Sequence, residues 1–293
     1  MPDVRPAGRA VAVAGLPEGI VVDARTGLAA IATRNPAAIV LLDARTGRVV
    51  RRVPTDGPAR HLKLVRPGGP VLVPEEPVDR LLQLSLPGGG TRSIPVGAHP
   101  HDSAATEGRI FVGNEFGQSI AVVIGHHVAQ TIGGFAQPGG LVSVGDGVAI
   151  VDVRANSVTL VDGRTLRVRG RLPAGAGPTH VVSGPDGRLY VTDTRGGAVF
   201  TYATRPALRR LGRLSLPGGP YGIAIDPARR RLWITLTATD RLVELTTDGT
   251  SLRVGDVYGT YRQANTVAVD PRDGRVLVAD AGPGLVQLID PRH

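Results

Sequence analysis

Short hydrophobic runs separated by turn residues repeat along the whole chain. Val, Leu, Ile and Ala alternate with polar residues over five or six positions, and the runs end at Gly, Pro, Asp or Asn. This period-two alternation predicts β-strands joined by tight turns. The repeating unit is clearest in GPTHVVSGPDGRLYVTDTRGGAVFTYAT (177–204) and recurs in QANTVAVDPRDGRVLVADAGPGLVQLID (263–290). Each unit contains at least three predicted antiparallel strands.

One residue that opens each unit recurs at spacings of 38 to 44 residues, at Pro17, Pro58, Pro100, Pro138, Pro178, Pro220 and Ala264. A fourth strand follows in most units, as at 48–53 and 168–172, and four short strands in about 40 residues are typical of a β-propeller blade. The last unit has only three strands, whereas the N-terminal segment RAVAVA (9–14) has no partner. An N-terminal strand that completes the last blade closes the ring and removes its free edges.

The sequence therefore predicts an all-β fold, a seven-bladed β-propeller of four-stranded antiparallel blades, closed by the N-terminal strand. We expect one domain, 1–293, with blades at 16–54, 57–97, 98–134, 136–173, 176–217, 218–258, and 262–290 together with 9–14. A closed ring has no sheet edge that requires a partner, so we expect a monomer.

Composition narrows the classes of function. The 40 Gly and 24 Pro residues supply the turns, and the absence of Cys excludes disulfides, thiolate metal ligands and a cysteine nucleophile. No segment has the form of a signal peptide, and no apolar run approaches the ~18 residues of a membrane span. The chain as given fits a cytoplasmic protein or a mature exported domain. The net charge of +9 comes almost entirely from Arg, and we expect these side chains to form a solvated rim.

Chemically active residues gather where the strands of each unit begin and end. In an antiparallel blade the start of the first strand and the end of the second lie on one face, so these positions ring one mouth of the central channel. Four of the seven histidines fall at or beside first-strand starts: His61, His99, His101 and His180. The residues that we predict to contact a ligand at this mouth are Glu18, Arg60, His61, Asp102, Tyr221 and Asn265.

Imidazoles and carboxylates in one concave site can bind a divalent metal or perform acid–base chemistry. His101 and His180 are therefore candidate catalytic residues. Glu75, Glu115 and Asp193 are candidate ligands of a divalent metal such as Mg²⁺ or Ca²⁺. The alternative is structural, because polar residues at strand ends also hydrogen-bond one another and ordered water.

Two resemblances follow from these motifs. Units such as GRLYVTDTRGGAVFTY and GRVLVADAGPGLVQLID, each preceded by a strand such as GIAIDP or TVAVDP, resemble YVTN/NHL-type, YncE-like seven-bladed propellers over nearly the whole chain. This resemblance implies the fold but no single function, because the superfamily has ligand-binding, partner-binding, nucleic-acid-binding and catalytic members.

The third unit, HPHDSAATEGRIFVGNEFGQSIAVV (99–123), resembles the catalytic blades of streptogramin (virginiamycin B) lyases. In those enzymes a Pro-His step and a Glu after the second strand serve acid–base and Mg²⁺-linked roles. The resemblance implies that His101 is the acid–base residue and Glu115 the metal-linked carboxylate. Here the pairing occurs once, with Asp193 in place of Glu on the blade of His180, and the Trp-Phe-Thr-Glu run of that family is absent.

Three functions are consistent with the sequence. The first is a YncE-like scaffold that binds a small ligand, a metal or a protein partner at the channel mouth. The alternative is a metal-assisted lyase or lactonase/hydrolase that uses the mouth histidines and acids. The third is single-stranded nucleic-acid binding, suggested by the charge, although few aromatic residues lie near a mouth to stack on bases. Whether the protein is an enzyme stays open.

Overall fold

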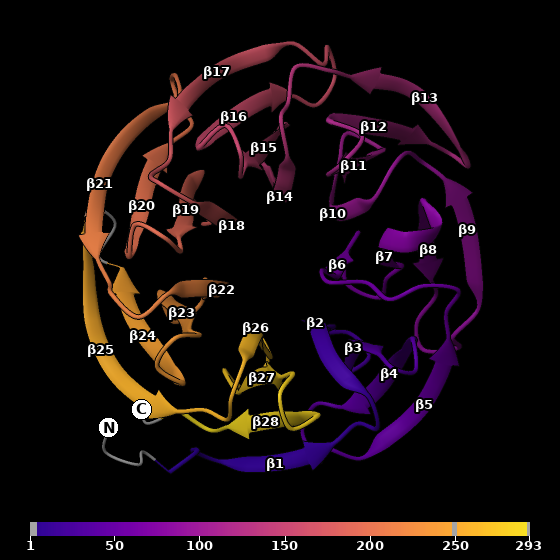
Figure 1. The fold of residues 1–293 in the computed structure, drawn as a ribbon, viewed down its shortest axis with the longest axis vertical. Helices are drawn as coiled ribbons and strands as arrows, with labels where there is room; N and C mark the ends of the chain where they lie inside the picture. Colours follow the sequence, from indigo (N-terminus) through magenta and orange to yellow (C-terminus); the bar gives the residue numbers. More distant parts are fainter. Residues whose placement is uncertain (1–4, 248–250, 292–293) are drawn as a thin grey trace.

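The computed structural model describes residues 5–247 and 251–291 and is a ring of seven four-stranded antiparallel sheets (Figure 1). The blades follow one another around a central axis, with the first strand innermost and the fourth outermost, and in the closing blade the outermost strand is β1 (Figure 1). The predicted all-β, seven-bladed propeller is confirmed. Helical structure in the described residues is limited to one short 3-10 turn, η1 (Glu76–Val78).

The first four blades have these bounds. Blade 1 consists of β2 (Leu16–Val22), β3 (Leu28–Arg34), β4 (Ala38–Asp43) and β5 (Val49–Pro54). Blade 2 consists of β6 (Lys63–Leu64), β7 (Val71–Glu75), β8 (Arg80–Leu84) and β9 (Thr91–Pro95). Blade 3 consists of β10 (Pro100–Thr106), β11 (Arg109–Asn114), β12 (Ser119–Ile124) and β13 (His127–Ile132). Blade 4 consists of β14 (Pro138–Val144), β15 (Gly147–Asp152), β16 (Ser157–Asp162) and β17 (Val168–Pro173).

The remaining blades complete the ring. Blade 5 consists of β18 (Pro178–Ser183), β19 (Arg188–Asp193), β20 (Ala198–Ala203) and β21 (Arg209–Ser215). Blade 6 consists of β22 (Pro220–Asp226), β23 (Arg231–Leu236), β24 (Arg241–Thr247) and β25 (Leu252–Gly259). Blade 7 combines β26 (Ala264–Val269), β27 (Val276–Asp280) and β28 (Leu285–Ile289) with the N-terminal strand β1 (Arg9–Ala12).

The ring closes as the sequence predicts. Strand β1 pairs antiparallel with β28, in a register that sets Arg9 opposite Leu288 and Ala12 opposite Leu285. The residue after β1, Val13, is fully buried in a hydrophobic cluster formed with blade 1. The two ends of the chain are therefore joined in one sheet, and β28 is not left with an unpaired edge.

Neighbouring blades pack through alternate residues of the same strands. In β3, Ala29 and Ile31 belong to the hydrophobic cluster shared with blade 7, whereas Ala30 and Ala32 belong to the cluster shared with blade 2. The same division recurs in the described part of the ring, where each hydrophobic cluster spans two adjacent blades. A strand that is buried on both faces reads as a continuous apolar run, which explains the Val, Leu, Ile and Ala runs of β4, β15 and β16.

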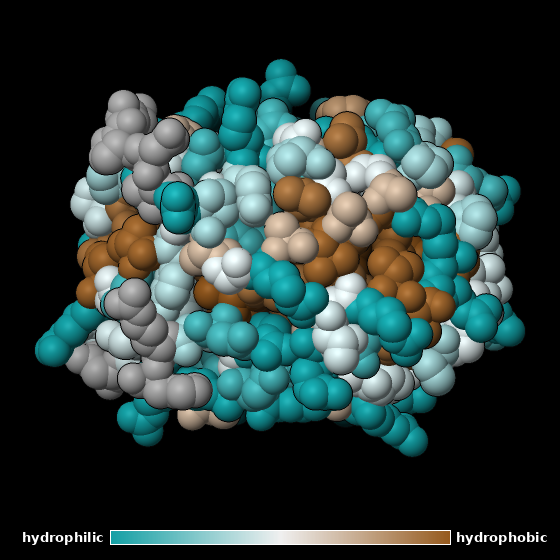
Figure 2. Space-filling view, turned by 90° about the horizontal axis from the view of Figure 1, so that it is seen from below, coloured by the Kyte–Doolittle hydropathy of each residue, from teal (hydrophilic) through white to brown (hydrophobic). Residues whose placement is uncertain are grey.

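The outermost strands form the wall of the ring. Figure 2 shows one side of this wall, where hydrophobic patches lie among hydrophilic side chains. Exposed positions on β5, β17 and β21 include Arg51, Arg169 and Arg209. Charged side chains on outer strands discourage edge-to-edge pairing with other chains. Among the described residues, no helix is long and apolar enough to cross a membrane.

Closure of the ring can be tested at two neighbouring positions. We expect Val13→Asp to lower the free energy of unfolding by at least about 3 kcal/mol, because the new carboxylate is buried without a partner. Ala12→Asp is the matched control, since Ala12 is exposed, and it should change stability by no more than about 0.5 kcal/mol. Urea unfolding measures both. Equal effects of the two substitutions would mean that the N-terminal strand is not packed into the ring.

Candidate functional site

Three histidines from different blades meet where the first strands begin. Nε2 of His61 lies 3.1 Å from Nε2 of His101 and 3.2 Å from Nε2 of His180. His61 precedes β6, His101 lies in β10 and His180 in β18, so the contacts join blades 2, 3 and 5. Each of the three residues exposes less than a tenth of its surface. We call His101, His61 and His180, in this order, the histidine chain.

The hydrogen-bond partners of His101 and His180, the two outer members of the histidine chain, determine which ring nitrogen of each carries the hydrogen. Nδ1 of His101 lies 2.8 Å from Oε1 of Glu76, and Nδ1 of His180 lies 2.9 Å from the backbone oxygen of Tyr221. A carboxylate or a carbonyl oxygen can only accept, so each Nδ1 carries the hydrogen and donates it. In the neutral rings the two Nε2 atoms therefore carry lone pairs, and both of them face Nε2 of His61.

Burial keeps two of these imidazoles uncharged. Removal from water, together with nearby His180 and His101, holds the pKa of His61 well below its usual value. Burial also lowers the pKa of His180 to about 3, against the opposing effect of its hydrogen bond to the Tyr221 carbonyl. At neutral pH, His61 and His180 are therefore neutral imidazoles.

A second group of ligand atoms lies beside His101 at the mouth. Glu76, His99 and Glu115 each contribute an atom within 4.8 Å of the other two, and we call these three residues the mouth cluster. Nε2 of His99 lies 3.6 Å from Oε2 of Glu76 and 3.9 Å from Oε2 of Glu115. The same Glu115 oxygen lies 3.3 Å from Nδ1 of His101, which connects the mouth cluster to the histidine chain.

The carboxylates of the mouth cluster are held in place by neighbouring side chains. Gln137 donates a hydrogen bond of 2.6 Å from Nε2 to Oε1 of Glu115, and Nε of Arg60 lies 3.5 Å from Oε1 of Glu76. Burial by itself would raise the pKa of Glu76, but the hydrogen bond from His101 and the charge of Arg60 lower it below its usual value. Glu76 is therefore an anion, which suits it to a cation or to a protonated histidine.

Local backbone geometry aims Glu76 and His99 into the mouth. Strand β7 ends at Glu75, and η1 begins at Glu76 with Pro77 in its first turn, so the two adjacent glutamates point to different surroundings. His99 has a left-handed backbone (φ 57°), and its amide donates a 2.8 Å hydrogen bond to Oδ1 of Asp79. Its ring stacks on Phe116, with ring centroids 4.2 Å apart. The cluster is therefore positioned by a turn in blade 2 and a loop before blade 3.

The structure does not bring two of the predicted metal ligands to this cluster. Glu75 accepts hydrogen bonds from the amides of Asp56 and Gly57, and Asp193 accepts from the amides of Ala176 and Gly177. In both blades the acid at the end of the second strand ties down the loop that enters the same blade. Carboxylates already bound to backbone amides satisfy those amides and hold the loop. Glu76, one residue further along, takes the place that Glu75 was predicted to have.

The other residues that the sequence predicts to contact a ligand differ in their surroundings. The Tyr221 ring stands edge-on to the His180 ring, with centroids 4.5 Å apart, and Glu18 lies 3.4 Å from Arg34. Asp102 is buried, which raises its pKa, and its Oδ2 lies 3.6 Å from Nζ of Lys63. Asn265 is half-buried on β26. The structure thus brings several of the predicted residues together on one face of the ring, and it adds Glu76 and His99, which were absent from the predicted ligand set.

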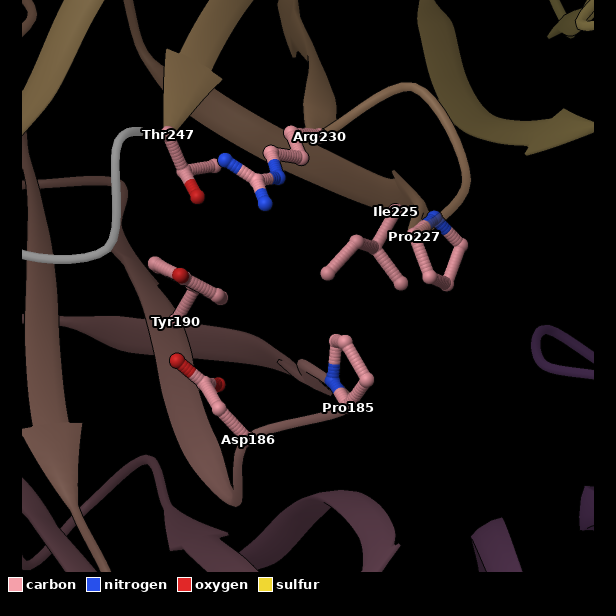
Figure 3. A pocket seen from close by; sticks show the side chains of 7 residues that line it. All are labelled: Pro185, Asp186, Tyr190, Ile225, Pro227, Arg230 and Thr247. Carbon is pink, nitrogen blue, oxygen red and sulfur yellow. The ribbon is translucent and has the colours of Figure 1, made fainter.

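A further pocket lies away from this mouth. It has a volume of about 250 Å³ and is lined by Pro185, Asp186, Tyr190, Ile225, Pro227, Arg230 and Thr247 (Figure 3). Four of these residues lie in the turns that join the first and second strands of blades 5 and 6, and Tyr190, Ile225 and Thr247 lie in the adjoining strands, so the pocket is at the opposite ends of the first strands from the mouth. We place the candidate site at the mouth, because buried titratable groups converge there.

Comparison with known proteins gives the fold but no family. No family model matches the chain, and no curated protein matches it. Among many similar solved structures, a chain of the Mitotic Checkpoint Complex superposes with a TM-score of 0.86 at 14% identity, covering 100% of this chain and 94% of that one. Hydrazine synthase of Kuenenia stuttgartiensis gives a TM-score of 0.83 at 17% identity, over 95% and 96% of the two chains. A streptogramin B lyase gives 0.80 at 18% identity, over 97% and 96%.

These structures differ widely in what their names describe, so the shared feature is the architecture. The class of protein is therefore a seven-bladed β-propeller. At one mouth of its ring, this chain combines the histidine chain with the carboxylate–imidazole mouth cluster.

The structural role of Asp193 gives a prediction. Asp193→Ala removes the acceptor of the amides of Ala176 and Gly177 and should lower the free energy of unfolding by about 2–4 kcal/mol. The same variant should keep the metal affinity of the wild-type protein. Urea unfolding and Mn²⁺ titration measure the two quantities. Loss of Mn²⁺ binding with unchanged stability would instead make Asp193 a ligand, as the sequence suggested.

A second prediction concerns the corresponding acid of blade 7. Asp280 is buried, and burial raises its pKa to about 8, against the opposing effect of the Tyr261 backbone amide. The folded state therefore binds a proton that the unfolded chain releases near pH 4. This contribution to stability is complete below about pH 4 and is lost as the pH rises through about 8.

Asp280→Asn cannot ionise, so the variant should gain stability relative to the wild type as the pH rises from 4 to 8. The measurement is the difference between the two unfolding free energies at several pH values, which cancels the titration of all other groups. A difference that stays constant with pH contradicts the raised pKa.

Proposed function

We propose that the protein is a ligand-binding propeller whose mouth cluster holds a divalent metal ion, and that this ion binds a small molecule through its oxygen atoms. The observation that carries the proposal is the convergence of Glu76, His99 and Glu115, with ligand atoms within 4.8 Å of one another. Two carboxylates and an imidazole suit Mg²⁺, Ca²⁺ or Mn²⁺, and the imidazole favours Mn²⁺ among them. Three protein ligands leave coordination positions for an incoming molecule.

The surroundings support this function in two ways. Gln137 and His101 both hydrogen-bond to the carboxylates of the cluster, and partners of this kind orient the ligands of a metal site. Arg60 adds a positive charge at the same mouth, which favours an anionic or carbonyl-bearing molecule over a cationic one. That the blades are of the YVTN/NHL, YncE-like kind is likewise a proposal, based on the blade motifs alone.

The proposal is tested by metal titration of matched variants. Glu115→Gln keeps the shape of the side chain but removes the charge, and it should weaken Mn²⁺ binding at least about 100-fold in isothermal titration calorimetry. Glu107→Gln is the control, because Glu107 pairs with Arg164 and lies at the turn between β10 and β11, away from the mouth. If Glu115→Gln and Glu107→Gln bind Mn²⁺ as the wild type does, the mouth cluster is not a metal site.

A metal-assisted lyase or hydrolase is a second candidate, favoured by the position of His101. Its Nδ1–H points at Glu76 and Glu115, whereas its Nε2 faces His61. In this arrangement a His101 ring that carries protons on both nitrogens can donate its Nδ1–H at the mouth as a general acid, and it is then left as a neutral ring with its hydrogen on Nε2, facing His61. The streptogramin B lyase shares this fold at 18% identity, which is compatible with such chemistry but does not assign it.

The two candidates differ in what His101 is needed for. In a binding scaffold, His101→Asn reduces metal affinity moderately, because only an orienting hydrogen bond to Glu76 is changed. In an enzyme, the same substitution abolishes turnover of an ester or lactone substrate in the presence of Mn²⁺ while the metal stays bound. No turnover of such substrates by the wild-type protein leaves the scaffold as the function.

A further inference from the structure

The pocket of about 250 Å³ between blades 5 and 6, which we call the rear pocket, combines an apolar floor with polar groups (Figure 3). Tyr190 and Ile225 form the floor, and both belong to the hydrophobic cluster that these two blades share. Pro185 and Pro227, from the turns of the two blades, add apolar walls. Sites for drug-sized molecules have volumes of roughly 300–1,000 Å³, so the rear pocket suits a smaller molecule with an apolar body.

Tyr190 brings a hydroxyl without a partner to the rear pocket. The residue exposes only 3% of its surface, yet no hydrogen bond joins its hydroxyl to another residue in the described part of the chain. Tyr202, the other buried tyrosine of blade 5, donates from its hydroxyl to the backbone oxygen of Pro173 at 2.7 Å. A buried tyrosine hydroxyl usually has such a partner. The Tyr190 hydroxyl lies between Asp186 and Thr247, where a ligand can reach it (Figure 3).

Arg230 carries a charge without a partner in the described structure. Its side chain is exposed at the rim of the rear pocket, and no hydrogen bond or ion pair joins its guanidinium to another described residue. The adjacent Arg229, in contrast, donates from Nη1 to Oδ2 of Asp226 at 3.0 Å and lies over Gly274 of blade 7. In Figure 3 the Arg230 guanidinium points from its turn toward Thr247. Its charge is therefore available to an anion in the pocket.

The backbone at Arg230 favours glycine. In the corresponding turns of blades 1 and 7, the fourth residue after a buried Asp is Gly27 or Gly274, with φ of 73° and 83°. Blade 6 has Arg230 at this position, the fourth residue after Asp226, with φ of 54°. A side chain costs free energy in this left-handed conformation, and strain of this kind is found most often at functional sites. The turn therefore has an arginine where glycine would suit the fold better.

The acidic residue that lines the rear pocket, Asp186, does not cancel the charge of Arg230. Its Oδ2 pairs with Nη1 of Arg188, and its Oδ1 accepts a 3.2 Å hydrogen bond from the amide of the same residue. Because Arg188 offsets the charge of Asp186, the guanidinium of Arg230 is the net charge at the pocket. One positive charge matches a carboxylate better than a phosphate monoester, whose charge is about −2.

We propose that the rear pocket is a binding site for a small organic carboxylate with an apolar body. The carboxylate pairs with Arg230, whose planar guanidinium can donate two parallel hydrogen bonds to it, and accepts a third from the Tyr190 hydroxyl. The apolar body lies against Ile225 and the two prolines of the pocket. The site is at the opposite ends of the first strands from the mouth cluster, and it does not depend on the proposed function.

4-Fluorobenzoate is the probe, because its fluorine NMR signal shifts and broadens on binding and gives the dissociation constant. The titration is done in EDTA, so that the carboxylate cannot bind through a metal ion at the mouth. We expect the wild-type protein to bind the probe with a Kd of about 1 mM or lower. Tyr190→Phe removes only the hydroxyl and should weaken binding about fivefold.

Arg230→Gly is the decisive variant, because it removes the cation and supplies the residue that the backbone favours. It should weaken binding of 4-fluorobenzoate at least about 10-fold, while its melting temperature equals or exceeds that of the wild type. Loss of binding in this variant is therefore not a consequence of unfolding.

Two matched controls separate a specific site from a general effect of charge. Arg229→Gln removes the same charge one residue away and should keep the wild-type affinity, with thermal melting to check its fold. 4-Fluorobenzamide has nearly the shape of the probe without its charge and should bind at least about 10-fold more weakly. The inference is overturned if the wild type does not bind 4-fluorobenzoate, if Arg230→Gly binds it as the wild type does, if folded Arg229→Gln loses as much affinity as Arg230→Gly, or if the amide binds equally well.

Discussion

The packing of each blade against both of its neighbours is the constraint on which the rest of the molecule depends. Residues that alternate along one strand belong to two different hydrophobic clusters, as Ala29 and Ala30 do in β3. A single blade therefore leaves two apolar faces open to water and cannot bury them alone. Only a closed ring buries both apolar faces of every blade, and β1 closes the ring by pairing with β28.

Closure of the ring also brings the first strands of the blades close together around its centre. First strands approach one another so closely that a Cβ on Gly140 would lie 2.7 Å from the backbone oxygen of Thr179, and one on Gly222 would lie 2.5 Å from that of Asn265. Glycine at these positions lets neighbouring first strands approach this closely without a clash. His61 and His180, from blades 2 and 5, meet at the centre of the ring. The same packing that stabilises the ring thus creates a small buried site, where polar groups interact strongly and a lone charge is costly.

The fold could be predicted because the same sequence pattern recurs in every blade. Alternation, turn residues and the regular opening residue of each unit report the same blade seven times, and the unpaired N-terminal segment indicates closure. That first-strand starts and second-strand ends share one face followed from topology alone, and His61, His101 and His180 do meet there.

Individual side-chain directions could not be predicted in the same way. Glu75 and Glu76 are adjacent in sequence, and only the 3-10 turn that begins at Glu76 decides which of them reaches the mouth. Asp193 lies at the end of a second strand, as predicted, but its carboxylate accepts hydrogen bonds from nearby backbone amides. His99 depends on a left-handed backbone and a stack on Phe116, for which the sequence carries no periodic signal.

The central claim, that the channel mouth is a metal site, is tested most directly by diffraction from crystals of the whole chain grown with Mn²⁺. Anomalous difference density at the manganese edge locates the ion without reference to activity or affinity. The account predicts a single strong peak between Glu76, His99 and Glu115. A peak at the surface pair His126 and His127, or no peak at the mouth at saturating Mn²⁺, would contradict it.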